Sequence, residues 1–73
     1  MNDKNKRSKV ENILFQLRKS HKMTQEELAT KLNVTRQTII SIEKGQYIPS
    51  LLLALKIAKV FNLPVEQIFS YEE

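Results

Sequence analysis

The sequence has no cysteine among its 73 residues and no long apolar run. Without cysteine, the chain cannot form a disulfide, a thiolate metal site or a thiol nucleophile. No apolar stretch approaches the roughly 20 residues that span a bilayer, and the N-terminal segment MNDKNKRSK has charges but no apolar core after them. These absences argue against a membrane span and a secretory signal, and they predict a cytoplasmic protein.

Hydrophobic residues make up 41% of the chain and charged residues 27%, which is typical of one small globular domain. The net charge of +4 is unevenly distributed. Residues 1–22 hold seven Lys or Arg against two acidic residues, giving +5, whereas residues 23–73 hold five against six Glu, giving −1. This asymmetry suits a polyanionic partner, and a solvated basic tail is the alternative interpretation.

Apolar periodicity predicts an all-α, compact five-helix bundle. The helices are expected at residues 10–20, 24–32, 35–44 and 51–61, followed by a short last helix over residues 64–69. No stretch alternates long enough to predict a strand. Residues 1–9 are interpreted as a flexible basic N-terminal arm, residues 10–69 as the folded domain, and residues 70–73 as a C-terminal tail.

The helix boundaries rest on capping residues. Thr24 and Glu27 form a capping box, and Thr35 is an N-cap two residues after Asn33, which tolerates the left-handed conformation that ends helices. Gly45 ends the third helix, and the loop QYIPS follows it.

The fourth helix, residues 51–61, is apolar at most positions. Its inward-facing residues are expected to be Leu51, Ala54, Leu55, Ile57, Ala58 and Phe61. Leu52 falls on the side of Lys56 and Lys59, where an apolar residue would mark a contact surface.

The second and third helices are joined by a turn of very few residues, and Ala29 is small where the two helices must meet. This combination predicts a helix-turn-helix, in which the second helix enters the DNA major groove. At its start, Arg36 can donate two hydrogen bonds to guanine and Gln37 can pair with adenine, while Ile40 can touch a thymine methyl group. Gln25 and Thr35 lie at helix N-termini, which attract phosphate.

The segment MTQEELATKLNVTRQTIISIEKGQYIPSLLLALKIAKVF resembles the XRE-type, lambda-repressor-like (Cro/C1-type) helix-turn-helix family, and the resemblance extends over roughly residues 10–69. It implies a five-helix bundle that binds operator DNA, commonly as a dimer. The resemblance implies that Gln25 contacts phosphate and that Arg36, Gln37 and Ser41 face bases, with Thr35 and Lys44 near the DNA backbone. It also implies that Arg18 and Glu43 form an ion pair that ties the first helix to the end of the third.

Simpler interpretations stay open for several of these residues. Arg36 and Gln37 also suit an ordinary solvated helix start, Ile40 suits a partly buried core position, and Ser41 suits a neutral surface position. The basic residues of the arm, Lys4, Lys6, Arg7 and Lys9, are either solvated or follow the phosphate backbone. The dimer face lies either on the apolar C-terminal segment or at Leu52.

The resulting hypothesis is a sequence-specific DNA-binding transcriptional regulator, acting as a repressor, that inserts helix 35–44 into an inverted-repeat operator as a homodimer. The alternative is an antitoxin or another protein-interaction module whose DNA binding is secondary. No enzyme, small-molecule substrate, cofactor or metal is expected. His21 stands alone, and Glu26 with Glu27 fits the electrostatics of a helix start.

Overall fold

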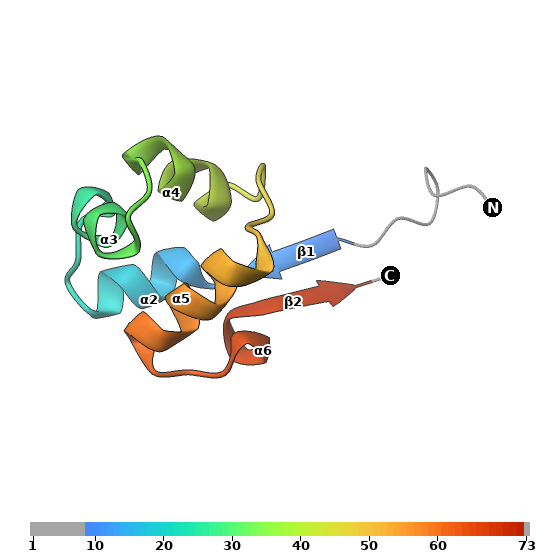
Figure 1. Cartoon of the computed structure of the whole chain (residues 1–73). Coiled ribbons are helices and arrows are strands. Elements are labelled where there is room, and N and C mark those ends of the chain that lie inside the picture. Colours follow the sequence, from blue (N-terminus) through green and yellow to red (C-terminus); the bar gives the residue numbers. More distant parts are fainter. Residues whose placement is uncertain (1–8, 73) are drawn as a thin grey trace.

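Helices surround a single apolar core in the computed structural model, which describes residues 9–72 (Figure 1). The elements in chain order are β1 (Lys9–Asn12), α2 (Leu14–Ser20), α3 (Gln25–Leu32), α4 (Arg36–Glu43), α5 (Leu51–Phe61), α6 (Val65–Ile68) and β2 (Phe69–Glu72). The predicted arm residues Lys4, Lys6 and Arg7 lie outside the described residues. Within the described range, no helix is long and apolar enough to cross a membrane.

A two-stranded antiparallel sheet joins the two ends of the described chain, so the fold is mostly helical and not strictly all-α. Lys9 pairs with Glu72 and Asn12 with Phe69, and the two strands project together from the helical body (Figure 1). The prediction of helix at residues 10–13 was therefore wrong, as was the prediction of no strand. Phe69 belongs to β2, and residues 70–72 of the expected tail continue that strand.

Asn12 explains why α2 begins only at Leu14. Its side-chain oxygen accepts a hydrogen bond from the Leu14 amide at 3.0 Å, an Asx-type turn, and its side-chain nitrogen donates to the Ile42 carbonyl at 3.0 Å. The Ile13 amide donates to the Ile68 carbonyl at 3.0 Å. The backbone of residues 9–12 is thus paired with residues 69–72, which are far away in the sequence. Helical periodicity within a short window cannot predict such a pairing.

The predicted caps are confirmed. Thr24 and Glu27 form a complete capping box at the start of α3, and the Thr35 hydroxyl accepts from the Thr38 amide. The structure adds a cap at the start of α5, where the Ser50 hydroxyl accepts from the Leu53 amide. Asn33 ends α3 in the left-handed conformation, with φ of 60°.

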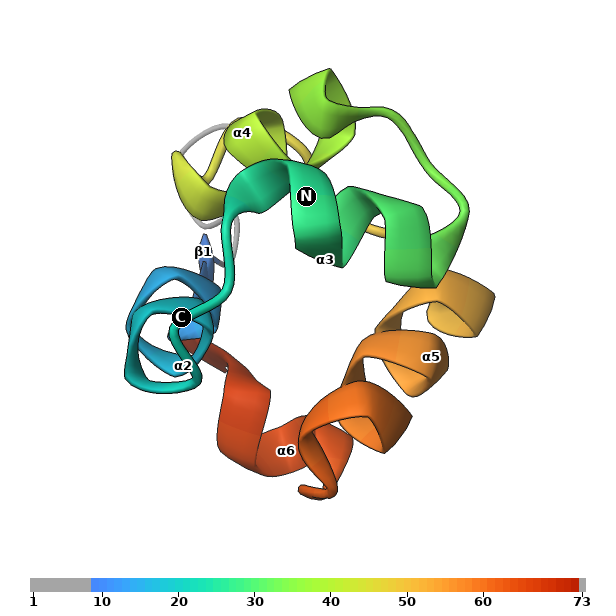
Figure 2. The same cartoon turned by 90° about the vertical axis from the view of Figure 1, so that its left-hand side faces the viewer.

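The core lies between the five helices, which Figure 2 shows arranged around it. Its fully buried large side chains are Leu14, Leu28, Leu32, Ile39, Ile42, Ile57 and Ile68. They come from α2, α3, α4, α5 and α6, so each helix contributes to the same core.

The rotation of α5 differs from the prediction. Leu51 is 72% exposed and Leu55 51% exposed, whereas Leu53, which was not predicted to face inward, is buried. The buried residues Leu53, Ala54, Ile57, Ala58 and Phe61 form one stripe at the spacing of a helix. Nearly every position of α5 is apolar, so the pattern alone did not determine which side faces the core.

Replacement of Asn12 tests the turn that starts α2. We expect Asn12→Ala to lower the free energy of unfolding by about 1–2 kcal/mol, because the Leu14 amide and the Ile42 carbonyl both lose a partner. Urea denaturation followed by circular dichroism measures this change. Glu11→Ala, at the exposed neighbouring position of β1, is the matched control, and equal losses in the two variants would contradict the assigned role.

Candidate nucleic-acid interface

The turn between α3 and α4 sets two short helices close together. Asn33 adopts the left-handed conformation, and the Val34 amide donates to the Ala29 carbonyl at 3.0 Å, which closes the turn. Ala29 is only 4% exposed, so its small side chain lies at the contact between the helices, as the sequence predicted. The motif is a helix-turn-helix in which α4 is the second helix.

α4 turns one face inward and one outward. Ile39 and Ile42 are fully buried in the core, while Arg36 and Gln37 are exposed. Residues four positions apart lie above one another on the same side of a helix. The outward side of α4 therefore carries two rows, Arg36 with Ile40 and Gln37 with Ser41. The Gln37 amide nitrogen donates to the Ser41 hydroxyl at 3.3 Å, which aligns that pair along the surface.

The four predicted base-contacting residues therefore lie together on the outward side of α4. Ile40 and Ser41 are partly buried, so they lie deeper than Arg36 and Gln37. For Ile40 this exposure is compatible with both interpretations made from the sequence, a groove contact and a partial core position. Lys44 is exposed immediately after the helix, at the opposite end of α4 from Arg36.

Arg18 and Glu43 come together in a bidentate ion pair. Arg18 Nε lies 2.6 Å from Glu43 Oε2, and Arg18 Nη2 donates to Glu43 Oε1 at 3.0 Å. Arg18 Nη1 donates to the Met23 carbonyl at 2.9 Å, and the two charged side chains are only 7% and 6% exposed. The hydrogen bond to Glu43 raises the pKa of Arg18 above its ordinary value, although burial acts in the opposite direction.

Gln25 joins the same network, which the sequence did not predict. Its side-chain nitrogen donates to Glu43 Oε1 at 3.2 Å, so one carboxylate contacts side chains from α2 and α3 while it lies at the end of α4. This contact orients Gln25 in the first turn of α3. Its amide still has a carbonyl oxygen and a second N–H available to a ligand.

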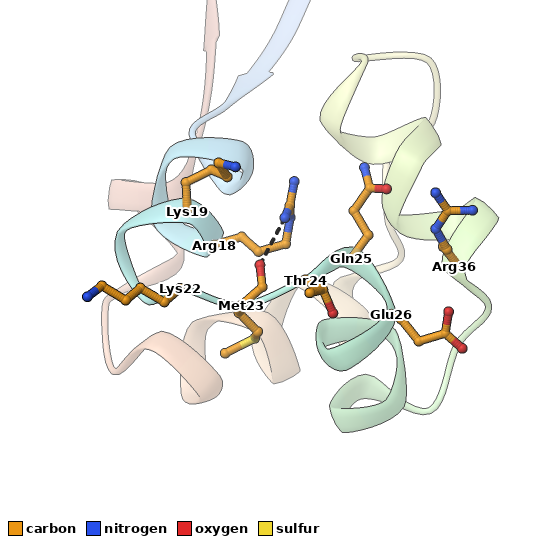
Figure 3. A pocket seen from close by; sticks show the side chains of 8 residues that line it. All are labelled: Arg18, Lys19, Lys22, Met23, Thr24, Gln25, Glu26 and Arg36. Atoms are coloured by element: carbon orange, nitrogen blue, oxygen red, sulfur yellow. Dashed lines mark hydrogen bonds between the residues drawn. The ribbon is translucent and has the colours of Figure 1, made fainter.

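A basic hollow lies beside the start of α3 (Figure 3). It is lined by Arg18, Lys19, Lys22, Met23, Thr24, Gln25, Glu26 and Arg36. In Figure 3, Lys19 and Lys22 lie on one side of the start of α3 and Arg36 on the other. A positive hollow next to a helix N-terminus favours phosphate.

Lys19 and Lys22 were not among the predicted site residues. Both are exposed, and both come from the segment RKSHK just before the capping box. Their signal in the sequence was the position of these charges immediately ahead of a helix start. That segment was interpreted only as the polar end of the first helix.

Comparison with known proteins identifies this arrangement. A model of the helix-turn-helix family matches residues 14–68, which include every helix of the structure. The chain belongs to the XRE-type helix-turn-helix family. The family predicted from the sequence is thereby confirmed.

The helix-turn-helix relatives span nearly the whole chain. An uncharacterized HTH-type transcriptional regulator of Methanocaldococcus jannaschii is 58% identical over 64 residues, covering 88% of this chain and 97% of the relative. The HTH-type regulator YgzD of Bacillus subtilis is 48% identical over 64 residues, with the same coverage. The crystal structure of the restriction-modification controller protein C.AhdI from Aeromonas hydrophila matches with a TM-score of 0.68 and 30% identity, over 74% of this chain and 82% of that one. These similarities support a DNA-binding transcriptional regulator.

Glu43→Gln tests the ion pair. We expect this variant to lose about 3–5 kcal/mol of stability, because it leaves the buried guanidinium of Arg18 without a counter-charge. Chemical denaturation gives the free energy of unfolding. Glu66→Gln, at an exposed position of α6, should change that energy by well under half as much, and a similar cost for both variants would contradict the structural role of Glu43.

Proposed function

We propose that this protein is a sequence-specific transcriptional regulator that binds an inverted-repeat operator as a homodimer and represses transcription. The observation that carries this proposal is the outward side of α4, where Arg36, Gln37, Ile40 and Ser41 form two adjacent rows beside a basic hollow. α4 enters the major groove, and its first turn meets the base edges.

The base-contacting residues divide by chemistry. Arg36 donates two hydrogen bonds to guanine, and Gln37 pairs with adenine while Ser41 holds its amide in place. Ile40, lower on the helix, contacts a thymine methyl group.

The phosphate contacts flank α4. Gln25 lies at the start of α3, and Lys44 lies just past the end of α4. The two residues therefore meet the DNA backbone on either side of α4. Thr35 caps α4 by accepting from the Thr38 amide at 3.2 Å, and the free amides beside it face a phosphate. Lys19 and Lys22 extend this positive surface from the basic hollow.

A dimer follows from the size of the domain. One α4 reads only a few base pairs, and two copies on an inverted repeat combine their half-site contacts when the half-sites lie about 34 Å apart, one helical turn. A repressor of this kind occupies a promoter and blocks polymerase. The similarity to a restriction-modification controller protein supports a regulatory role.

The second candidate, a protein-interaction module whose DNA binding is secondary, is favoured by Leu52. This large apolar side chain is 67% exposed on α5. Such a module would be isolated with a tightly bound second protein.

Two alanine variants distinguish base reading from backbone binding. We expect Arg36→Ala to lose about 1–3 kcal/mol of affinity at one position of an operator selected from random-sequence duplexes, and to accept other bases there. Lys44→Ala should weaken binding to all duplexes alike and reduce the salt slope by about one. Fluorescence anisotropy with single-base variants of the operator, at several salt concentrations, measures both effects.

Lys31→Ala is the control for this experiment, because Lys31 is exposed near the C-terminal end of α3 and is not among the proposed contacts. Uniform loss across all duplexes for Arg36→Ala would refute its base-reading role.

A further inference from the structure

A second hollow lies between the two-stranded sheet and the end of α4. It has a volume of about 600 Å³, and it is lined by residues 9–12 of β1 together with Glu43, Lys44 and Gly45. Ile48, in the loop that follows α4, completes the lining. β1 therefore borders the same space as Lys44, which the proposed function places on the DNA backbone.

Two lysines supply the positive charge of this hollow. Lys9 and Lys44 are both exposed, and neither forms a salt bridge within the part of the chain that the structure describes. Of the two glutamates in the lining, Glu43 is already paired with Arg18, so Glu11 is the acid that offsets the lysines. Two lysines against one uncompensated glutamate leave the hollow positive, and a positive hollow attracts an anion such as a phosphate group.

Hydrogen bonds fix β1 against the end of α4. The Asn12 side-chain nitrogen donates to the Ile42 carbonyl at 3.0 Å, and antiparallel pairing with β2 places Lys9 opposite Glu72. The backbone of Lys9 thus keeps a fixed place relative to Lys44, although the two residues lie far apart in the sequence. A group that is already positioned loses less conformational freedom when it binds, so its contact contributes more to affinity.

The sheet lengthens the surface that α4 begins. Figure 1 shows β1 and β2 projecting from the helical body past the end of α4 and the loop after it. A helix in the major groove lies between two phosphate backbones, and Lys44 at its end meets one of them under the proposed function. A lysine that lines the same hollow as Lys44 reaches the same DNA strand at a neighbouring phosphate.

We propose that β1 is an additional DNA-binding element, in which Lys9 acts with Lys44 to bind phosphates of one DNA strand at the hollow between the sheet and the end of α4. The contact carries no sequence information, because phosphates are the same beside every base, but it fixes the orientation of α4 in the groove. This inference rests on the proposed function for the placement of Lys44 on DNA.

Lys9→Gln tests the contact, because it removes the charge and keeps a long polar side chain at an exposed position. One phosphate contact changes the slope of log affinity against log salt by about 0.9. Between about 50 and 200 mM salt, the parent should therefore lose about 3–4-fold more affinity than Lys9→Gln. The difference should be the same for a selected operator and for a shuffled duplex, as measured by fluorescence anisotropy.

Lys59→Gln is the matched control, because it removes the same charge from the last turn of α5. It should keep the salt slope of the parent. Thermal melts followed by circular dichroism check that the variants fold. An unchanged salt slope for Lys9→Gln would overturn the proposal.

Glu11→Gln should have the opposite effect. Since Glu11 is the uncompensated acid of the hollow, its neutralisation should strengthen binding to every duplex by about 2–5-fold at low salt. Glu66→Gln, at an exposed position of α6, is the control for loss of one negative charge. Equal affinities for Glu11→Gln and Glu66→Gln would contradict an anion in this hollow.

The absence of cysteine allows a measurement that does not depend on loss of affinity. Lys9→Cys carrying an iron–EDTA group should cut the selected duplex at backbone positions next to the bases that α4 protects. Glu66→Cys, labelled in the same way, is the control, because Figure 2 shows α6 and α4 on opposite sides of the core. Cleavage by labelled Lys9→Cys that is no stronger than the control would overturn the proposal.

The binding data separate failure of this inference from failure of the proposed function. If the parent prefers the selected duplex and Lys9→Gln keeps the parent's salt slope, this inference alone fails. If the parent binds every sequence alike but Lys9→Gln still lowers the slope, the proposed function fails and the phosphate contact of β1 stands.

Discussion

One buried carboxylate, that of Glu43, fixes the position of α4 against α2 and α3. Glu43 lies at the end of α4, pairs with Arg18 of α2 through two contacts and accepts from Gln25 of α3. A buried ion pair adds little net stability compared with an apolar substitute, because both charges lose their water. Its effect here is geometric: α4 can adopt one orientation relative to α2 and α3 without leaving a charge unpaired. Among the described residues, no buried side-chain nitrogen or oxygen lacks a hydrogen-bond partner.

The same arrangement explains how a small domain provides both a core and a surface. α4 sends Ile39 and Ile42 inward and presents Arg36 and Gln37 outward, so one helix of eight residues provides both core packing and the surface proposed to contact DNA. α5 likewise buries one stripe and leaves Leu51 and Leu52 exposed. With so few residues, a contact surface has to be built on the outer faces of the elements that form the core.

Local chemistry made the helix-turn-helix predictable. A cap such as Thr24 or Thr35 acts within three residues of itself, and Asn33 ends a helix by its own backbone conformation, so each signal can be identified in a short window. The start of α2 was not predictable in this way, because Asn12 bonds to Ile42 and its strand pairs with residues near the other end of the chain.

Two further features could not be predicted because they depend on how the helices pack against one another. They are the side of α5 that is buried and the hydrogen bond from Gln25 of α3 to Glu43 of α4. An almost entirely apolar helix fits a core on more than one side, and only the neighbouring helices decide which side is buried. The positions of Arg36, Gln37 and Ser41 follow from their place on a helix. Lys19 and Lys22 line the basic hollow because they lie just ahead of the start of α3 in the chain, a position that the sequence interpretation treated only as the polar end of the preceding helix.

Sequence-specific binding is the central claim, and a comparison of two duplexes tests it most directly. The protein would be titrated with the best duplex selected from a random pool and with a shuffled duplex of equal length and composition, each at several salt concentrations. We predict a preference of about a thousandfold or more that persists at physiological salt. Equal affinities that both vanish as salt rises would show that the basic surface attracts any polyanion, and would contradict base reading by α4.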